Sequence, residues 1–496
     1  MKGIPGLTSD TENTTGPPDN ASGFGSVAGG SEAEQLRREN AELRRQLHES
    51  EEQRMWLREL VNKNPHTGLP IRRVFDKQIG SLLEGQQGSN GRDARTVVGV
   101  VRLDRSYDRI KDTRDRGKAL LFNTADRLQR LVGDHLYQSD RLDEFIFAVN
   151  GLPGRDAAEL LGRRIMETIA RPHEPPAKDV SFGCRVGLSL DSGGLSKEEL
   201  LGNAYIALSQ AETDGARVVV YDESIGNLYR ENLELERSLH SVSRDGFDQF
   251  RLMYQPFAAA DGRIVGAEAL IRWFHPRLGP VSPARFIPIA EETGAIRLLG
   301  QWTLYNAARQ LRDWSRISGR ELHMSVNLSP AQFKQQDLVT RIEGILEALA
   351  LGGDSLKLEL TEGAIMEDPE EAARKMAMLH DRGIRISIDD FGTGYSSLSY
   401  LKRFPVDTLK IDRSFIEDVT TNPSNQEIVR AIISMAKSLR IESLAEGVET
   451  VEQRNFLVAE GCDVIQGYLY SPPVPARDFE PFLVTGRIDP GTSIVS

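Results

Sequence analysis

The stretch LKLEL at residues 356–360 alternates leucine with Lys357 and Glu359, and IRISIDD at residues 384–390 alternates isoleucine with polar residues in the same way. Alternation with a period of two predicts β-strands, because successive side chains of a strand point to opposite faces. The apolar face of each strand is expected to pack on helices, whereas Lys357, Glu359 and Asp389 face the other way. Strands of this kind are typical of a barrel wrapped by helices, with its site at the strand ends.

The same unit recurs through the C-terminal half of the chain, where short strands alternate with helices from about residue 250 onward. Repeated β/α units over a region of this length predict a mixed α/β fold, with a TIM-like (β/α)8 barrel at residues 246–485. The expected strands are Val265–Ile271, His323–Asn327, Leu356–Leu360, Ile384–Asp389, Thr408–Asp412, Ile441–Glu446 and Val464–Gln466.

Acidic residues fall near the C-terminal ends of these strands, where barrel sites are built. They are Glu268, Glu359, Asp389, Asp390 and Glu446. A single glutamate at a strand end is usually a solvated rim residue, and a single DDFGTG segment is usually a turn. Carboxylates at matching ends of successive units instead predict one shared site.

Carboxylates gathered at one mouth raise one another's pKa and need a compensating cation. Hard divalent ions such as Mg²⁺ or Mn²⁺ take oxygen ligands, and the amide oxygen of Asn327 extends the set. Histidine and cysteine do not converge on this mouth, so zinc is not expected. The sequence therefore predicts a magnesium or manganese site.

The composition is that of an ordinary globular protein, and 496 residues leave room for two or three domains. The net charge of −12 disfavours binding to nucleic acid polymers or to anionic membranes, because both require clustered lysine and arginine. The two cysteines, Cys184 and Cys462, lie in different halves and favour a reducing compartment. With no apolar leader and no long apolar run, we expect a cytoplasmic protein without a membrane span.

Changes in composition predict the domain organisation. We expect a disordered tail at 1–31, a coiled coil at 32–63, a smaller α/β domain at 64–223, a helical connector at 224–245, the barrel at 246–485 and a tail at 486–496.

The predicted coiled coil rests on apolar residues at alternating steps of four and three. The positions are Leu36, Asn40, Leu43, Leu47, Leu57 and Val61, interrupted by the polar Ser50 and Arg54. A buried asparagine in such a seam favours two strands in register, so a homodimer is expected. The alternative is a lone amphipathic helix that folds back on the next domain.

Eight short blocks of the C-terminal half occur in a fixed order. They are Tyr254-Gln255-Pro256, Glu268-Ala269-Leu270 followed by Arg272-Trp273, SVNLS from Ser325, ELTE from Glu359, DDFGTGYSSL from Asp389, Lys410-Ile411-Asp412, AEGVET from Ala445 and QGYLYSPP from Gln466. Together these blocks resemble the signature of the EAL domain family of cyclic di-GMP phosphodiesterases over about residues 240–480. Any one block is weak evidence, whereas all of them in order are specific.

The resemblance implies a role for each matching residue. One metal ion would be held by Glu268, Asn327, Glu359 and Asp389, and a second by Asp389, Asp390 and Glu446. Lys410 would lie beside the attacking water, as a proton acceptor or as a charge stabiliser. Gln466 would orient the water or a ligand, and Glu362 would steady the Asp-Asp loop. For the substrate, the implied contacts are Gln255, Leu270, Arg272, Asp412 and the outer carboxylate Glu449.

Residues 64–223 resemble the GGDEF family of diguanylate cyclases less closely, through NPHTGLPIRRVF and LLGNAYIALSQAETDGARVVVYD. The naming motif reads Arg141-Leu142-Asp143-Glu144, and two side chains replace the glycines that let backbone approach phosphates. The upstream aspartate candidate, Asp104, is out of frame. We therefore expect a catalytically inactive, regulatory domain, where GTP or a protein partner could still bind.

The expected function is metal-dependent hydrolysis of cyclic di-GMP to linear pGpG, with two bound ions and dimerisation through the coiled coil and the barrel. One alternative is a receptor that binds cyclic di-GMP without hydrolysing it and signals through the coiled coil. Another is a scaffold in which the N-terminal parts recruit a partner and catalysis is secondary. The complete set of carboxylates favours the enzyme.

Overall fold

A computed structural model of the chain describes residues 28–84, 95–104, 114–172, 182–191, 193–392 and 401–490. The tail expected at 1–31 lies almost wholly outside the described residues, as does the latter part of the tail expected at 486–496. The chain forms two compact units, Met1–Gly226 and Asn227–Ser496, which divide near the start of helix α6 (Glu223–Asp245). Among the described helices, none combines the length and the apolar character that a membrane span requires.

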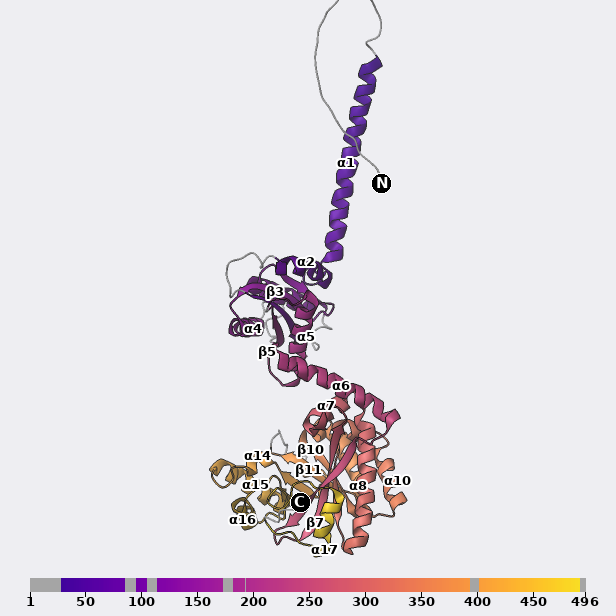
Figure 1. The fold of residues 1–496 in the computed structure, drawn as a ribbon, viewed down its shortest axis with the longest axis vertical. Coiled ribbons are helices and arrows are strands. Elements are labelled where there is room, and N and C mark those ends of the chain that lie inside the picture. The colour runs from indigo at the N-terminus through magenta and orange to yellow at the C-terminus, as the bar shows by residue number, and fades with distance from the viewer. Residues whose placement is uncertain are drawn as a thin grey trace, which may run out of the picture. The chain divides into compact units, whose positions relative to one another are not determined.

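The N-terminal unit begins with a single long helix, α1 (Ala28–Asn62), in the region where a coiled coil is expected (Figure 1). Leu43, Leu47 and Val61 of the predicted seam are 59%, 60% and 56% exposed. The side chains of Leu36 and Leu57 lie outside the described residues. The apolar residues in the described part of the seam are therefore open to solvent.

The rest of this unit is built on a five-stranded sheet in the order β2-β3-β1-β4-β5. β1 pairs antiparallel with both β3 and β4, and β4 pairs parallel with β5. The strands are β1 (Arg95–Leu103), β2 (Leu136–Gln138), β3 (Glu144–Leu152), β4 (Cys184–Leu190) and β5 (Val218–Val220).

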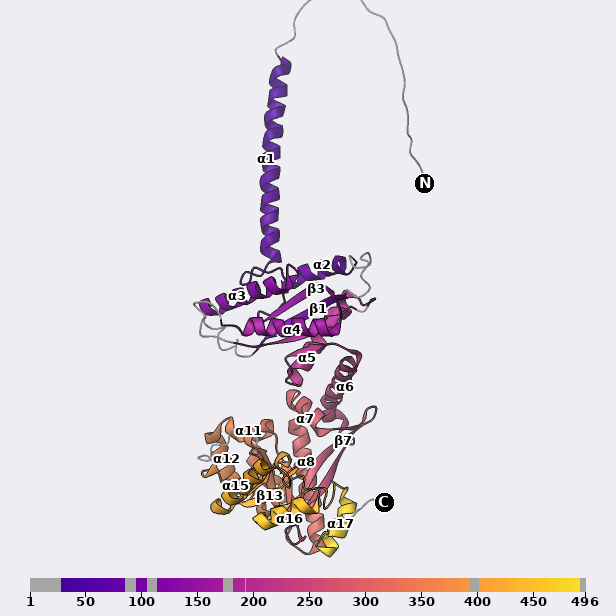
Figure 2. The same cartoon turned by 90° about the vertical axis from the view of Figure 1, so that its left-hand side faces the viewer.

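Helices cover both faces of this sheet (Figure 2). Val97 and Val101 of β1 pack with α3 (Arg114–Val132) and α4 (Arg155–Ala170). Val98 and Val100 pack with α2 (Arg72–Glu84) and α5 (Lys197–Thr213) on the other face. Because β1 is buried on both faces, it is a continuous apolar run and not an alternating one.

The sequence predicts a hairpin over Arg141–Asn150, and the structure places it differently. β3 begins at Glu144 and pairs with β2 through Leu136 and Phe147, so Arg141 lies in the connecting turn. Strand β2 is only three residues long and is followed by a polar turn, so its sequence is too short to show the alternation of a strand.

The second unit is a closed barrel of eight strands, which confirms the predicted TIM-like fold. Its order is β6-β14-β13-β12-β11-β10-β9-β7, and β6 pairs with β7 to close the ring, while β8 (Gly279–Val281) extends the sheet at β7. The barrel strands are β6 (Phe250–Ala259), β7 (Ile264–His275), β9 (His323–Asn327), β10 (Leu356–Thr361), β11 (Arg385–Phe391), β12 (Thr408–Ile411), β13 (Glu442–Ala445) and β14 (Val464–Ile465).

Strand β6 departs from the regular β/α repeat, because it runs antiparallel to both of its neighbours. A tight turn joins it directly to β7: the Asp261 carboxylate accepts the amide of Arg263 at 3.0 Å, and Gly262 has φ +82°. An Asp-Gly turn of this kind forms a hairpin and not a crossover. The expected strands therefore begin at β7 and omit β6.

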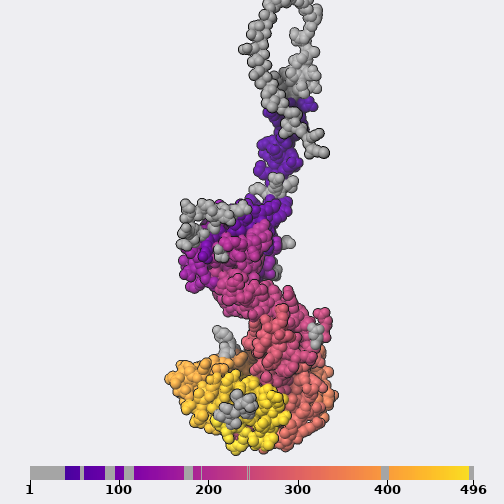
Figure 3. Space-filling model, in the orientation of Figure 1, coloured from indigo at the N-terminus to yellow at the C-terminus, as the bar shows by residue number. Residues whose placement is uncertain are grey.

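Helices surround the barrel on the outside. They are α7 (Pro283–Glu292), α8 (Ile296–Ser318), α9 (Pro330–Phe333), α10 (Leu338–Leu349), α11 (Glu362–Met366), α12 (Pro369–His380), α14 (Arg413–Ile416), α15 (Pro423–Leu439), α16 (Val451–Glu460) and α17 (Ala476–Thr485), with a 3₁₀ turn at Gly353–Ser355. α17 packs on α8, where the rings of Phe479 and Trp314 stack with centroids 4.3 Å apart. The yellow surface of the C-terminal segments borders the red surface of the earlier helices in Figure 3.

The parallel register confirms which side chains enter the barrel. Leu358, Ile386 and Ile388 are buried in the outer core between strands and helices. On the other face of the strands, Glu359 is level with Asn327 of β9, and Thr361 is level with Asp389 of β11. The polar residues of neighbouring strands are thus brought to one end of the barrel.

Candidate active site

Lys410 on β12 is the centre of the candidate site, and it is 1% exposed. Its ammonium lies 2.6 Å from Glu359 Oε2 and 2.9 Å from Asp389 Oδ1, and it also pairs with Glu446. These carboxylates come from β10, β11 and the residue after β13, so Lys410 joins three different strands. These side chains therefore meet at the C-terminal ends of the strands.

Burial and mutual repulsion set the protonation of this group. Burial by itself lowers the pKa of Lys410, but its carboxylate neighbours outweigh burial and hold that pKa well above its usual value. Burial raises the pKa of Glu359 well above its usual value, against the attraction of Lys410. Burial, opposed by Lys410, also raises the pKa of Glu446 to about 8.

A second group of side chains holds Glu268 on β7. Its Oε1 accepts a hydrogen bond from Asn327 Nδ2 at 2.6 Å, and its Oε2 accepts one from Gln466 Nε2 at 2.6 Å. Gln466 Nε2 also lies 3.0 Å from Gln255 Oε1, and Gln255 Nε2 donates to the Ser471 carbonyl at 3.1 Å. Ser471 could not be singled out from the sequence, because it contributes only its backbone carbonyl.

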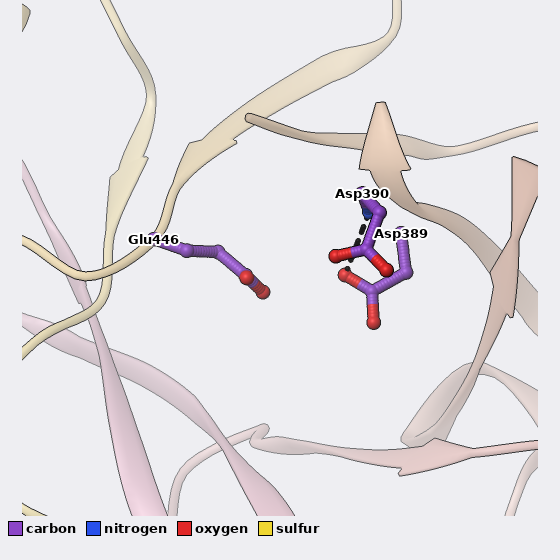
Figure 4. Close-up of side chains that lie close together, drawn as sticks. All are labelled: Asp389, Asp390 and Glu446. Carbon is purple, nitrogen blue, oxygen red and sulfur yellow. Dashed lines mark hydrogen bonds between the residues drawn. The ribbon is translucent and has the colours of Figure 1, made fainter. Parts of the chain in front are cut away.

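The Asp-Asp pair ends β11 with an irregular backbone. Asp390 has φ +54°, and the pairing of β11 with β12 shifts register between Ile388 and Phe391. Aspartate is among the few residues that tolerate this left-handed conformation. The irregularity turns Asp390 toward its neighbours: ligand atoms of Asp389, Asp390 and Glu446 all lie within 4.8 Å of one another (Figure 4).

The electrostatics of Asp390 reflect this crowding. Burial, followed by the charges of Asp389 and Asp412, raises the pKa of Asp390 to about 6. In Figure 4 the Glu446 carboxylate extends toward the two aspartates from another part of the barrel rim. Three acidic side chains at this separation form an arrangement that a cation stabilises.

The residues fit a divalent cation on two observations. Glu359 Oε1 is buried and has no hydrogen-bond partner in the described part of the chain. In addition, the single positive charge of Lys410 faces the carboxylates of Glu359, Asp389, Glu446 and Glu268. Carboxylate and amide oxygens are the ligands that Mg²⁺ and Mn²⁺ prefer. The donor set therefore suits hard ions.

A cavity of about 460 Å³ opens beside this cluster, and its lining includes Leu270, Arg272 and Asn327. Most of its wall is apolar, and α7 and α8 supply about half of the lining residues. Arg272 Nη1 donates to the Ile271 carbonyl at 3.0 Å, and burial lowers the pKa of Arg272. The lining also includes the Gln332 amide and the Glu291 carboxylate, so the apolar part of the pocket suits a flat ring and its Arg272 edge suits a negatively charged group.

Three of the predicted site residues make contacts outside the cluster around Lys410. The Glu449 carboxylate accepts a hydrogen bond from Arg413 at 2.9 Å, and Asp412 caps α14 by accepting the amide of Ser414 at 3.0 Å. Glu362 lines a separate small cavity with Phe391, and its Oε2 has no hydrogen-bond partner among the described residues. Residues 393–398 of the DDFGTGYSSL block lie outside the described residues.

In the N-terminal unit, Glu144 is enclosed by donors. Its Oε2 accepts hydrogen bonds from Arg102 at 2.7 and 3.0 Å, and its Oε1 accepts from Ser139 at 2.6 Å and Tyr205 at 2.7 Å. β1 and β3 place Arg102 directly opposite Glu144. Asp104 pairs instead with Arg185 at 2.9 Å.

Comparison with known proteins gives one family match. A model of the EAL domain family matches residues 236–473. The chain is 34% identical over 457 residues to "Cyclic di-GMP phosphodiesterase NbdA" of Pseudomonas aeruginosa, covering 91% of this chain and 58% of that protein. It is 32% identical over 432 residues to "Cyclic di-GMP phosphodiesterase PdeR" of Escherichia coli, covering 86% and 63%. The chain thus spans about three fifths of the length of these relatives.

Two solved structures are also similar. "PaMucR Phosphodiesterase, c-di-GMP complex" is 40% identical and covers 50% of this chain and 99% of that chain, with a TM-score of 0.48. "Vibrio cholerae LapD S helix-GGDEF-EAL (bound to c-di-GMP)" covers 85% of this chain and 99% of that chain, with a TM-score of 0.55 at 17% identity. The second likeness is one of fold.

Proposed function

Through residues 236–473 the chain belongs to the EAL domain family, and from that membership we propose that it hydrolyses cyclic di-GMP to linear pGpG. The observation that carries the proposal is the complete carboxylate set around Lys410, with Glu268 held by Asn327 and Gln466. A protein that only bound the nucleotide would not require this many desolvated carboxylates, which are costly to bury.

The geometry supports two adjoining ion sites, for Mg²⁺ or Mn²⁺. Glu268, Asn327 and Glu359 would form the first with Asp389, and Asp390 and Glu446 would complete the second with the same Asp389. Bound ions would lower the pKa of water and offset charge on the attacked phosphate. The chain's own contribution is to hold these ligands on separate strands, whose spacing is fixed by backbone hydrogen bonds.

Of the two roles open to Lys410, the contacts favour charge stabilisation. A proton acceptor must be neutral at rest, whereas in the metal-free protein the carboxylate neighbours hold the Lys410 ammonium charged. A fixed cation at this position would stabilise negative charge that develops near the strand ends. It would also keep Glu359 and Asp389 from repelling each other.

The residues expected to contact the substrate fall into two groups: some line the cavity, and others are already hydrogen-bonded within the protein. Arg272 and Leu270 line the cavity and remain suited to a phosphate and a base. Gln255 is buried and its amide is used by Gln466 and Ser471, so it suits the support of Gln466 better than contact with substrate. Asp412 and Glu449 likewise serve the loops around the site.

The N-terminal unit is proposed to be a catalytically inactive GGDEF-like regulatory domain. Glu144 accepts four hydrogen bonds, from Arg102, Ser139 and Tyr205, so it has no free lone pair for a metal ion. This argues against a GTP site that uses Glu144. A protein partner on this unit stays compatible with the proposal.

The deciding experiment incubates the purified protein with cyclic di-GMP and either Mn²⁺, Mg²⁺ or a chelator, and resolves the products by chromatography. Metal-dependent pGpG is expected from the wild type and not from Glu268→Ala, which removes a ligand of the first ion. Saturable binding of cyclic di-GMP without pGpG would replace the hydrolase with the receptor alternative. Full turnover by Glu268→Ala would overturn the ligand assignment.

A further inference from the structure

Gln453 on α16 is 5% exposed and lies outside the residues assigned to the site. Its Oε1 accepts the backbone amides of Glu449 at 2.8 Å and Thr450 at 2.9 Å. Its Nε2 donates to the carbonyls of Ile416 at 3.1 Å and Glu417 at 3.0 Å. Every donor and acceptor of this side-chain amide is therefore used on backbone.

These four hydrogen bonds join two loops that both carry site residues. Glu449 and Thr450 belong to the segment after β13, which begins with Glu446. The carbonyl groups come from the end of α14, the short helix that directly follows Lys410 and Asp412. One buried side chain thus connects the loop of a proposed metal ligand with the loop of the lysine that pairs with it.

A second contact joins the same loops on the surface. Arg413 donates to Glu449 at 2.9 Å, and the stem of Arg413 lies over Gly447, where an added Cβ would be 2.4 Å from Arg413 Cγ. Gly447 also has φ +64°, which favours glycine there. The Arg413 side chain is 53% exposed, so its ion pair contributes little, and the buried amide is the stronger link.

Glu446 depends on this link because it lies just beyond the end of β13. Its own backbone amide is held only by the Ile411 carbonyl at 3.2 Å, a long hydrogen bond. Two residues further on, Val448 is held by backbone hydrogen bonds with Gln466 and Leu469, and from Glu449 onward the loop is anchored to α14 by Gln453. Loss of the anchor would let the Glu446 carboxylate move relative to Asp389 and Asp390, and displacements of about 1 Å weaken a site of this kind.

We propose that Gln453 is a positioning residue that fixes the Glu446 loop against the Lys410 loop and thereby sets the affinity of the site for its second divalent ion. The inference rests on the proposed function for the identity of the ion site. It assigns to Gln453 no contact with substrate or metal.

The test compares two buried glutamines in the full-length chain. Gln453→Met keeps most of the side-chain volume and removes all four hydrogen bonds. The matched control is Gln138→Met in the N-terminal unit, because Gln138 is 0% exposed and donates to the carbonyls of Arg141 at 2.7 Å and Glu144 at 2.8 Å. Both variants are expected to lower the melting temperature, but only Gln453→Met should change the binding of Mn²⁺.

Mn²⁺ binding is measured by calorimetry and by electron paramagnetic resonance of the free ion, without substrate. Gln453→Met should weaken the second Mn²⁺ by about 10- to 100-fold, the range for residues that orient metal ligands, while Gln138→Met should bind as the wild type does. Unchanged Mn²⁺ affinity in a folded Gln453→Met, or an equal loss in both variants, would overturn the proposal.

If Gln453→Met does not fold, Gln453→Glu keeps the acceptor for the amides of Glu449 and Thr450, loses the donor to the carbonyls of Ile416 and Glu417, and should weaken the second Mn²⁺ in the same direction. Wild-type Mn²⁺ affinity in a folded Gln453→Glu would then overturn the proposal. Hydrolysis of cyclic di-GMP is measured in a separate assay from Mn²⁺ binding. A wild type that binds two Mn²⁺ without hydrolysing cyclic di-GMP would refute the hydrolase, and the Mn²⁺ affinities would still decide the role of Gln453.

Discussion

Lys410 and its carboxylates carry a shared charge that no member could hold alone in the barrel interior. Isolated buried charges cost several kcal/mol, and removing one partner of a buried pair costs about 3–5 kcal/mol. The three ion pairs of Lys410 reduce this cost but leave an excess of negative charge. A site arranged in this way is already assembled before metal binds, and its carboxylates take up protons to relieve the excess.

This proton uptake predicts how metal affinity depends on pH. The pKa of Glu446 is raised from 4.5 to about 8, and that of Asp390 from 3.8 to about 6, so a proton must leave Glu446 when an ion binds near neutral pH. The affinity for the second Mn²⁺, which Asp389, Asp390 and Glu446 would hold, should rise up to tenfold per pH unit between about 6 and 8, more steeply below about 6, and level off above about 8.

Calorimetric titrations with Mn²⁺ in buffers of different ionisation enthalpy measure the protons released at each pH. The raised pKa of Glu446 also means that the folded, metal-free protein binds a proton more tightly than the unfolded chain. Its stability should therefore fall as pH rises from 4.5 to about 8. Mn²⁺ affinity that does not change between pH 6 and 8 would contradict the protonation assigned to Glu446.

At the scale of elements, the strands that alternate most regularly were the easiest to predict. Residues 356–360 and 384–390 become β10 and β11 almost without change, because one face packs on helices and the other enters the barrel. β6 could not be predicted as part of the same repeat, since its turn with β7 depends on the backbone of Asp261 and Gly262. Local pattern identifies a strand, whereas its direction depends on the connection that follows.

The same limit applies to the site. Strand-end carboxylates could be predicted to converge, because parallel strands end at one edge of a barrel. The hydrogen-bond partner of each side chain could not be predicted from the sequence. Gln255 is bound by Gln466 and the Ser471 carbonyl, and Glu449 is bound by Arg413; both arrangements depend on loops that meet only in the folded chain. The sequence signal at Gln453 is the Thr450-x-x-Gln453 capping box that starts α16, and this signal does not reveal the hydrogen bonds to the carbonyls of Ile416 and Glu417.

The strand pair β1–β3 predicts that glycines alone will not create a diguanylate cyclase. Replacing Arg141 and Leu142 by glycine opens the turn. It leaves both hydrogen bonds from Arg102 to Glu144 Oε2 in place. We expect no cyclic di-GMP from GTP and Mg²⁺ in this variant. The assay belongs in a Glu268→Ala background, so that hydrolysis cannot consume a product, and chromatography detects cyclic di-GMP. Its appearance would refute the inactive assignment.

At the scale of the whole molecule, each unit has its own core and its own sheet, and α1 adds a stripe that belongs to neither core. Leu43 and Leu47 are each more than half exposed in the single chain. An exposed stripe with heptad spacing on a 35-residue helix is costly in water unless another helix covers it. A second copy of the chain, joined through parallel α1 helices, meets this requirement.

We therefore predict that the full chain dimerises through α1, and that Leu43→Ser with Leu47→Ser weakens the dimer. Four leucines would be lost between the two chains, and at 1.5 kcal/mol or more for each the loss is roughly 6 kcal/mol, about a ten-thousandfold change in dissociation constant. Arg45→Ser with His48→Ser is the matched control, because both positions lie off the seam and are exposed. Sedimentation velocity measures the association of both variants. Equal association of the two would remove α1 from the interface and leave the barrel as the remaining candidate.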